Sequence, residues 1–473
     1  MLRLQGGQVE SLWDEVLPER LRRLPDDLAQ IDGLLRDEAL LAPIEAHWDQ
    51  EAGERGRSAR GHGRPTIPMQ TYVRLMLVKH RYGWGYETLM REVSDSLHLR
   101  RFCLIPLDEE VPDESTVRKL TRRLGPETVA ELSRLVIAKA ERETRFRARA
   151  VRIDSTVVEA DVRYPTDDGL AADGVRTLAR EGKRLAAKVG GTAVRIRDRS
   201  RAVGKRRRAI GRTLRRRTGQ AKAEVLALTG EAGRLLQESV REARRLAAEA
   251  RAKALALYRS GKAPARRKAT RILAAAERLE TLAERCEKVV VQIRKRLAGE
   301  PIRDRLVSLF DPDARPIRKG RLRAPTEFGY VEQLAEVAPN TKSGTRGFIL
   351  PPASLPGNPG ENELLPDTVL ELQRLGLSPR EVALDGGFQT KASEQTLAPL
   401  APERVYIAGR ASPGSKRTQR RLARYRTGAE GRISHLKRRH GLRRSRLKGG
   451  QGERTWTGWA VLAYNIETYG AHA

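Results

Sequence analysis

The amino-acid sequence predicts an α/β protein, in which a mixed β-sheet is interrupted by a long helical insert and preceded by an all-α N-terminal region. Short runs rich in β-branched residues predict strands at 148–160, 328–337, 381–384 and 404–408. Residues 166–300 are rich in Ala, Leu, Arg, Lys and Glu and nearly free of Pro and aromatic residues, which favours helices. Before residue 125, apolar residues recur at helical spacing.

These patterns divide the chain into four predicted parts. Residues 1–62 form an acidic helical segment, and residues 63–146 form a helical domain suited to DNA binding or dimerisation. The sheet domain combines residues 147–165 with residues 301–473, and the basic helical insertion occupies residues 166–300.

Each predicted element has a local signal. Met69 to His80 and Tyr86 to Val93 repeat one apolar helical face, and the Pro112–Ser115 run caps a third helix that stops at Gly125-Pro126. A linking helix (127–146) follows. After the insert we expect a strand at 305–311, a Pro/Gly loop at 351–366, a helix at 367–375 and a last helix at about 455–469.

The charge of the chain predicts a polyanionic partner. The formal net charge is +32 with a pI near 10.8, and such a field attracts nucleic acid. The first 60 residues are the exception, with eight Arg against thirteen acids. The two cysteines are far apart in sequence, so they predict no disulfide framework and a reducing compartment. No apolar run predicts a membrane span or a signal peptide, and we expect an intracellular protein.

Three acids occur where metal-dependent phosphodiester chemistry would need them. Asp154 and Asp385 each follow a β-branched run, and Glu430 is the single acid among fourteen Lys and Arg between residues 416 and 448. Carboxylates at the ends of neighbouring strands meet at one edge of a sheet. Two hard cations held there would act on both sides of a phosphorus atom. Taken singly, an Asp at a strand end is usually a turn former or a helix cap.

The segment around Glu430 adds cations to this group. Arg426, Glu430 and Lys437 share roughly one side of a helix, so Glu430 could bind a metal ion while its neighbours hold phosphates. The alternative is a surface Arg–Glu pair worth about 0.3–0.5 kcal/mol. Gly386, Gly387, Gly428 and Gly431 would leave room for the close approach of metal and DNA.

In these motifs the chain resembles the DDE transposases of bacterial insertion sequences. Their helical N-terminal domain is matched by Gly-Arg-Pro at 63–65 and by the segments 75–79, 82–87 and 111–116. The catalytic motifs are matched by Ile-Asp-Ser-Thr at 153–156, by Asp-Gly-Gly-Phe at 385–388, and by Arg426-x3-Glu430-x6-Lys437. The tyrosine of that last signature is replaced by Ala423, with Tyr425 nearby.

The resemblance implies an RNase H-like catalytic domain and Mg²⁺- or Mn²⁺-dependent cutting and joining of DNA. Asp154, Asp385 and Glu430 would be the catalytic and metal-binding residues, with two ions in each site. The partners would be double-stranded DNA, as terminal inverted repeats and target, and further copies of the chain in a homodimer or larger assembly. The location would be the bacterial cytoplasm, at the nucleoid.

A larger set of cations is expected to contact DNA. It comprises side chains beside Glu430, on the third N-terminal helix and in the basic insertion: Arg426, Arg432, Lys437, Arg438, Arg439, Arg118, Lys119, Arg206, Arg207 and Arg208. The last three belong to the tract 195–217, which has twelve cations and one acid; a solvated helix face is the alternative interpretation. His435 and His440 are expected to be ordinary surface or packing residues.

Two other functions stay open from the sequence. A non-catalytic DNA-binding or architectural protein would need the basic tracts but not the three acids. A metal-dependent nuclease would use the same acids without strand transfer.

Overall fold

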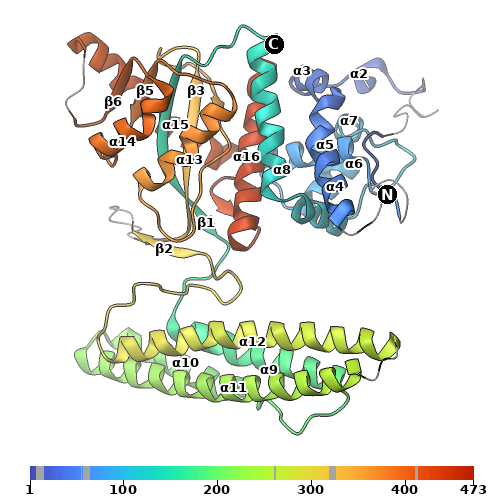
Figure 1. Cartoon of the computed structure of the whole chain (residues 1–473), viewed down its shortest axis with the longest axis vertical. Helices are drawn as coiled ribbons and strands as arrows, with labels where there is room; N and C mark the ends of the chain where they lie inside the picture. Colours follow the sequence, from blue (N-terminus) through green and yellow to red (C-terminus); the bar gives the residue numbers. More distant parts are fainter. Residues whose placement is uncertain are drawn as a thin grey trace. The chain divides into compact units, whose positions relative to one another are not determined.

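The computed structural model describes residues 1–6, 15–54, 56, 64–259, 261, 263–318, 326–410 and 414–472. These residues form two compact units, one built from residues 1–161 and 319–473 and the other from residues 162–318 (Figure 1). The first unit contains the sheet and the N-terminal helices, and the second is almost entirely helical. The predicted boundary at residues 62–63 lies outside the described residues.

The N-terminal helices have the caps that the sequence predicted. α5 (Met69–Tyr82) ends at Gly83, whose φ of 67° is the left-handed conformation that glycine adopts readily. The Asp113 side chain accepts a hydrogen bond from the Ser115 N–H and begins α8 (Glu114–Glu143). α8 breaks at Gly125 (φ 69°), so the predicted third helix and linking helix are its two halves. The other elements of this region are α2 (Glu19–Arg22), α3 (Asp26–Leu35), η1 (Glu38–Leu41), α4 (Ala42–Glu54), α6 (Tyr86–Asp95) and α7 (Leu97–Phe102).

The sheet of the first unit is mixed, as predicted. β1 (Ala150–Ala160) pairs antiparallel with β3 (Thr326–Ala338) and parallel with β5 (Glu381–Leu384). β5 in turn pairs parallel with β6 (Arg404–Ile407). Two short strands extend it: β4 (Phe348–Ile349) on β3 and β7 (Arg444–Ser445) on β1.

Helices cover both faces of the sheet, which explains the imperfect alternation of the β1 sequence. Val151 and Ile153 are buried in one apolar core with Leu365 and Leu372 of α13 (Glu361–Arg374). Val158 is buried on the other side with Leu436 and Tyr464. These last two side chains come from α15 (Lys416–Arg439) and α16 (Gly449–His472), and α14 (Thr390–Leu397) follows β5.

The second unit consists of four helices. α11 (Gly219–Arg259) and α12 (Ala263–Leu297) lie side by side and pack against α9 (Asp167–Val189) and α10 (Ser200–Thr213) (Figure 1). Their core is built from Leu, Val, Ile and Ala side chains such as Leu178, Leu246 and Ile272. Short elements follow α10 and end the unit, η2 (Leu214–Arg216) and β2 (Arg315–Arg318).

The strand predicted at 305–311 is wrong, because that segment has no regular secondary structure. Leu306 and Leu309 are nevertheless buried, against the apolar core of the helical unit. The Gln292 side chain of α12 satisfies the backbone of Leu306, with Nε2 donating to its carbonyl at 3.3 Å and Oε1 accepting from its N–H at 2.5 Å. The apolar residues that resembled a strand are therefore buried by a helix instead of a sheet.

A buried pair of carboxyl groups lies between β3 and α16. Glu332 and Glu453 are both fully buried, and the Thr457 hydroxyl donates to Glu453 Oε1 at 2.6 Å. Burial, followed by the charge of Glu453, raises the pKa of Glu332 well above its usual range. Folding therefore favours the protonated form of the Glu332 carboxyl.

We expect Glu332→Gln to be more stable than the wild type at neutral pH. Above pH 4.5 the unfolded chain releases the Glu332 proton while the folded chain keeps it, so stability falls as pH rises towards the folded pKa. The variant lacks this loss, which is at most about 1.4 kcal/mol per pH unit. Urea unfolding at pH 5 to 8, monitored by tryptophan fluorescence, measures the free energy of unfolding. The signal reports on the first unit, because all five Trp lie outside residues 162–318. An advantage of the variant that did not grow with pH would contradict the assignment.

Candidate metal centre

Asp154 and Asp385 lie side by side on neighbouring parallel strands. Ile153 of β1 pairs with Leu384 of β5, so Asp154 is the next residue of β1 and Asp385 directly follows the last residue of β5. β5 ends at Leu384, whereas β1 continues past Asp154 and stays paired with β3. The two carboxylates that the sequence predicted to converge are therefore brought together at the carboxyl end of β5.

Glu361, which sequence reasoning missed, contributes the third carboxylate of this cluster. Oxygen atoms of Asp154, Asp385 and Glu361 all lie within 4.8 Å of one another, which is close enough to hold a metal ion. Glu361 is the first residue of α13, and the Gln333 side chain donates to its carbonyl at 2.9 Å. No family motif or regular spacing marks Glu361 in the sequence.

The local structure around Glu361 corrects two predictions. The predicted helix 367–375 begins earlier, at Glu361, in the segment that was expected to be a loop. At this helix start the Glu363 side chain accepts a hydrogen bond from the Gly360 N–H at 3.2 Å. Gly387 was expected to leave room for metal and DNA. A Cβ there would instead overlap Glu361 Oε2, so the glycine makes room for the third carboxylate.

Burial and neighbouring charges both act on the Asp154 carboxyl group. Only 8% of Asp154 is exposed, and burial, followed by the charge of Asp385, raises its pKa to about 6. The guanidinium of Arg426 partly offsets this effect. Oxygen ligands with excess negative charge are those that Mg²⁺ and Mn²⁺ prefer, and a bound cation would relieve the repulsion.

Arg426 and Glu430 extend the cluster from α15. Arg426 Nη2 lies 2.8 Å from Asp385 Oδ1 and 3.1 Å from Glu430 Oε1, so one guanidinium joins the two carboxylates. The Glu430 side chain is 64% exposed and is not in the close group of three. Its charge nevertheless contributes to the raised pKa of Asp154. Glu430 thus lies at the solvent side of the cluster.

The other predicted DNA-contact residues fall into three groups. Lys437 Nζ donates to the Val157 carbonyl of β1 at 2.8 Å, while Arg438 and Arg439 are exposed. Arg118 pairs with Glu114 at 3.2 Å, and Lys119 is exposed. In the helical unit the three arginines differ in their nearest acids. Arg206 has Glu231 at 2.9 Å and Arg207 has Asp168 at 3.7 Å, whereas Arg208 is exposed and forms no ion pair with any described residue.

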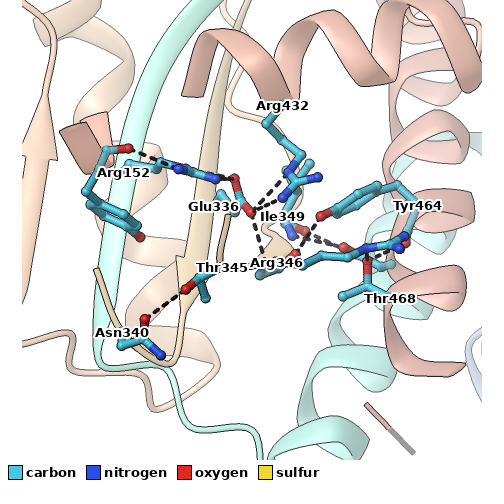
Figure 2. A network of polar contacts seen from close by, with 12 residues as sticks. Arg152, Glu336, Asn340, Thr345, Arg346, Ile349, Arg432, Tyr464 and Thr468 are labelled. Carbon is cyan, nitrogen blue, oxygen red and sulfur yellow. Dashed lines mark hydrogen bonds and ion pairs between the residues drawn. The ribbon is translucent and has the colours of Figure 1, made fainter. Parts of the chain in front are cut away.

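Arg432 points into the protein, where it belongs to a polar network between α15 and the strands β1 and β3 (Figure 2). Its guanidinium lies 3.0 Å from Glu336 Oε1 on β3. Arg152 of β1 donates to Glu336 Oε2 from Nε (2.8 Å) and Nη2 (2.6 Å), and its Nη1 donates to the Tyr425 carbonyl at 3.0 Å. The buried carboxylate of Glu336 thereby fixes α15 to both β1 and β3.

Gly428 belongs to the same network. A Cβ at this position would overlap the guanidinium of Arg152, so the glycine serves the contact between α15 and β1 and not the approach of DNA that was predicted. A Cβ on Gly431 would meet nothing within 4 Å. His440 is buried, and its ring packs near Tyr464 with the centroids 5.9 Å apart; burial lowers its pKa to about 3. His440 is a packing residue, as expected.

Comparison with known proteins identifies part of the chain. Residues 19–123 match the family model described as "Transposase domain (DUF772)". This stretch of the chain is similar to a transposase domain. This match supports a transposase of the insertion-sequence type, for which DNA is the implied partner. No curated protein and no solved structure matches the chain. Within the described residues, no helix combines the length and the apolar character needed to cross a membrane.

We expect Glu336→Gln to destabilise the first unit by about 3–5 kcal/mol, because it leaves two guanidiniums without their buried counter-charge. Urea unfolding followed by tryptophan fluorescence measures the loss. The matched control is Glu381→Gln. Glu381 of β5 also lies between two arginines, Arg421 (2.7 Å) and Arg404 (3.1 Å), but these are more exposed than the arginines around Glu336. Equal losses of stability in both variants would show that the buried network stabilises the unit no more than the exposed ion pairs do.

Proposed function

We propose that this protein is a DNA transposase of the DDE type, with an RNase H-like catalytic domain that cuts transposon ends and joins them to target DNA. The observation that carries the proposal is the convergence of Asp154 and Asp385 on adjacent parallel strands, with Glu430 joined to Asp385 through Arg426. The transposase domain at residues 19–123 supports the same class from a separate part of the chain.

In this proposal the carboxylates hold divalent cations, Mg²⁺ or Mn²⁺ and two in each site. Bound there, the cations would supply an activated nucleophile and stabilise the leaving oxygen. Asp154, Asp385 and Glu361 offer an inner set of oxygen ligands, and Glu430 offers an outer one on the solvent side. Placed between two of these carboxylates, Arg426 holds their separation and offsets part of their charge.

The protein frame has the rigidity that such chemistry needs. Asp154 is held by a strand that is paired on both sides, and its Oδ1 accepts a hydrogen bond from the Ser155 N–H at 2.8 Å. Glu430 and Arg426 lie on a helix that is fixed to β3 by Glu336 and to β5 by Glu381. Asp154, Arg426 and Glu430 are thus placed by regular elements, and Asp385 directly follows a strand.

The test uses the full-length protein, Mg²⁺ or Mn²⁺, and DNA that carries the ends of the element. Strand-transfer products are expected. Cleavage alone would instead indicate a metal-dependent nuclease, and DNA binding without either product would indicate a non-catalytic protein. Asp154→Asn, Asp385→Asn and Glu430→Gln should each lower product formation at least about a hundredfold while DNA binding remains. The exposed Asp367→Asn is the control.

Glu361→Gln tests the metal site without any DNA. We expect Mn²⁺ affinity to fall about tenfold or more, as in Asp385→Asn, because a carboxylate oxygen of the inner set is lost. Isothermal titration of the protein with MnCl₂ measures the affinity. Asp367→Asn lies on the same helix and should bind like the wild type. Wild-type affinity in Glu361→Gln, with loss in Asp385→Asn, would remove Glu361 from the site.

A further inference from the structure

The cations of α10 and its N-cap residue Arg199 differ in their partners. Arg199, Arg206 and Arg207 have acids nearby, whereas a row on the outer side has none at ion-pair distance among the described residues. Residues 199, 203, 206, 210 and 213 follow one another at helical spacing. Val203, Ile210 and Thr213 are buried there. The inner arginines are both paired with acids of α11. Arg199 lies 2.9 Å from Glu238 and 2.7 Å from Glu242, and Arg206 lies 2.9 Å from Glu231.

The outer side carries four cations in a row, which we call the α10 stripe: Arg201, Lys205, Arg208 and Arg212. Their spacing of four, three and four residues places them along one face of the helix, and all four are exposed. Within the described part of the chain, no acid forms an ion pair with any of them. Among the described residues, the inner cations thus have carboxylates at ion-pair distance and the outer ones do not, although the charge of Arg201 still contributes to lowering the pKa of Asp198.

Such a stripe is unfavourable in the isolated protein, because like charges three and four residues apart destabilise a helix. A partner that brings negative charge in a line would reverse this effect. The stripe is about 16 Å long, and a DNA duplex lying along it would present roughly nine phosphate charges over that length. A lipid surface fits less well, because membrane helices use their apolar face, and here Val203 and Ile210 are already buried in the helical unit.

We propose that the α10 stripe is a binding surface for the phosphate backbone of duplex DNA, independent of base sequence. It gives the helical unit of residues 162–318 a function separate from the carboxylate cluster. The choice of DNA as the polyanion rests on the proposed function. Of the three arginines predicted from this tract, only Arg208 belongs to the stripe, whereas Arg206 and Arg207 have acidic neighbours.

The experiment compares two full-length variants that lose the same number of charges. The stripe variant is R201Q/K205Q/R208Q/R212Q. The control is R184Q/R244Q/R251Q/K253Q, whose surface cations all belong to the same helical unit and each have an acid neighbour. Binding of a fluorescent random-sequence duplex is measured over a range of salt concentrations. The slope of log affinity against log salt should become less steep by about 2–4 in the stripe variant and by less than about 1 in the control.

Further measurements keep the outcome decisive. Thermal unfolding should show no loss of stability in the stripe variant, since like-charge repulsion is removed. R201K/R208K/R212K keeps the charges and should keep the wild-type slope. An unchanged slope in the stripe variant, equal changes in both variants, or a change seen only with duplex RNA would overturn the proposal. Because the readout is binding, it stands or falls separately from strand transfer, which is tested by Asp154→Asn.

Discussion

A single buried carboxylate, that of Glu336, holds the helix with Arg426 and Glu430 against the strand with Asp154. Glu336 lies on β3 and receives one guanidinium from β1 and one from α15, so three elements far apart in sequence meet at one charge. An unpaired charge at this depth would be costly, and the pairing is favourable only when all three elements are in place. The geometry of the carboxylate cluster therefore depends on a contact that contains none of its members. The overlap between a Cβ at 428 and Arg152 shows how close this contact is.

The carboxylate cluster itself works against folding. Burial, followed by the charge of Asp385, raises the pKa of Asp154 to about 6, so a charged Asp154 is less favourable in the folded protein. Arg426 offsets part of that cost from one side, whereas Glu430 adds to it from the other. Such an arrangement suits a site that binds cations, because the surplus negative charge that destabilises the cluster by itself also strengthens cation binding. The network at Glu336 and the cluster at Asp154 are thus complementary: one is neutralised within the protein and the other is not.

The sequence predicted those features that depend on neighbours along the chain. Local pattern and the geometry of parallel strands account for the strand at 381–384, for the strand predicted at 404–408 and found at 404–407, for the caps at Asp113 and Gly83, and for the approach of Asp154 to Asp385. Features set by packing were beyond it. Glu361 is brought to the cluster by the start of α13, a position that no spacing marks, and Leu306 is buried by a helix although its segment resembles a strand. Helical periodicity placed Arg432 on the basic helix but could not predict that its side chain points towards Glu336.

The same limit applies to the net charge of +32, which describes the whole chain and does not say where on the surface the cations lie. In the helical unit, the structure shows which cations are paired with acids and which are exposed. On α11, the acids Glu231, Glu238 and Glu242 recur about every seven or four residues, so they lie along one side of that helix and meet the inner cations of α10. Because these acids neutralise one side of α10 and leave the other side cationic, the positive electrostatic potential of this helix is strongest on the side away from the core. A basic tract of uniform composition thereby becomes two surfaces, one that stabilises the fold and one that remains open to a polyanion.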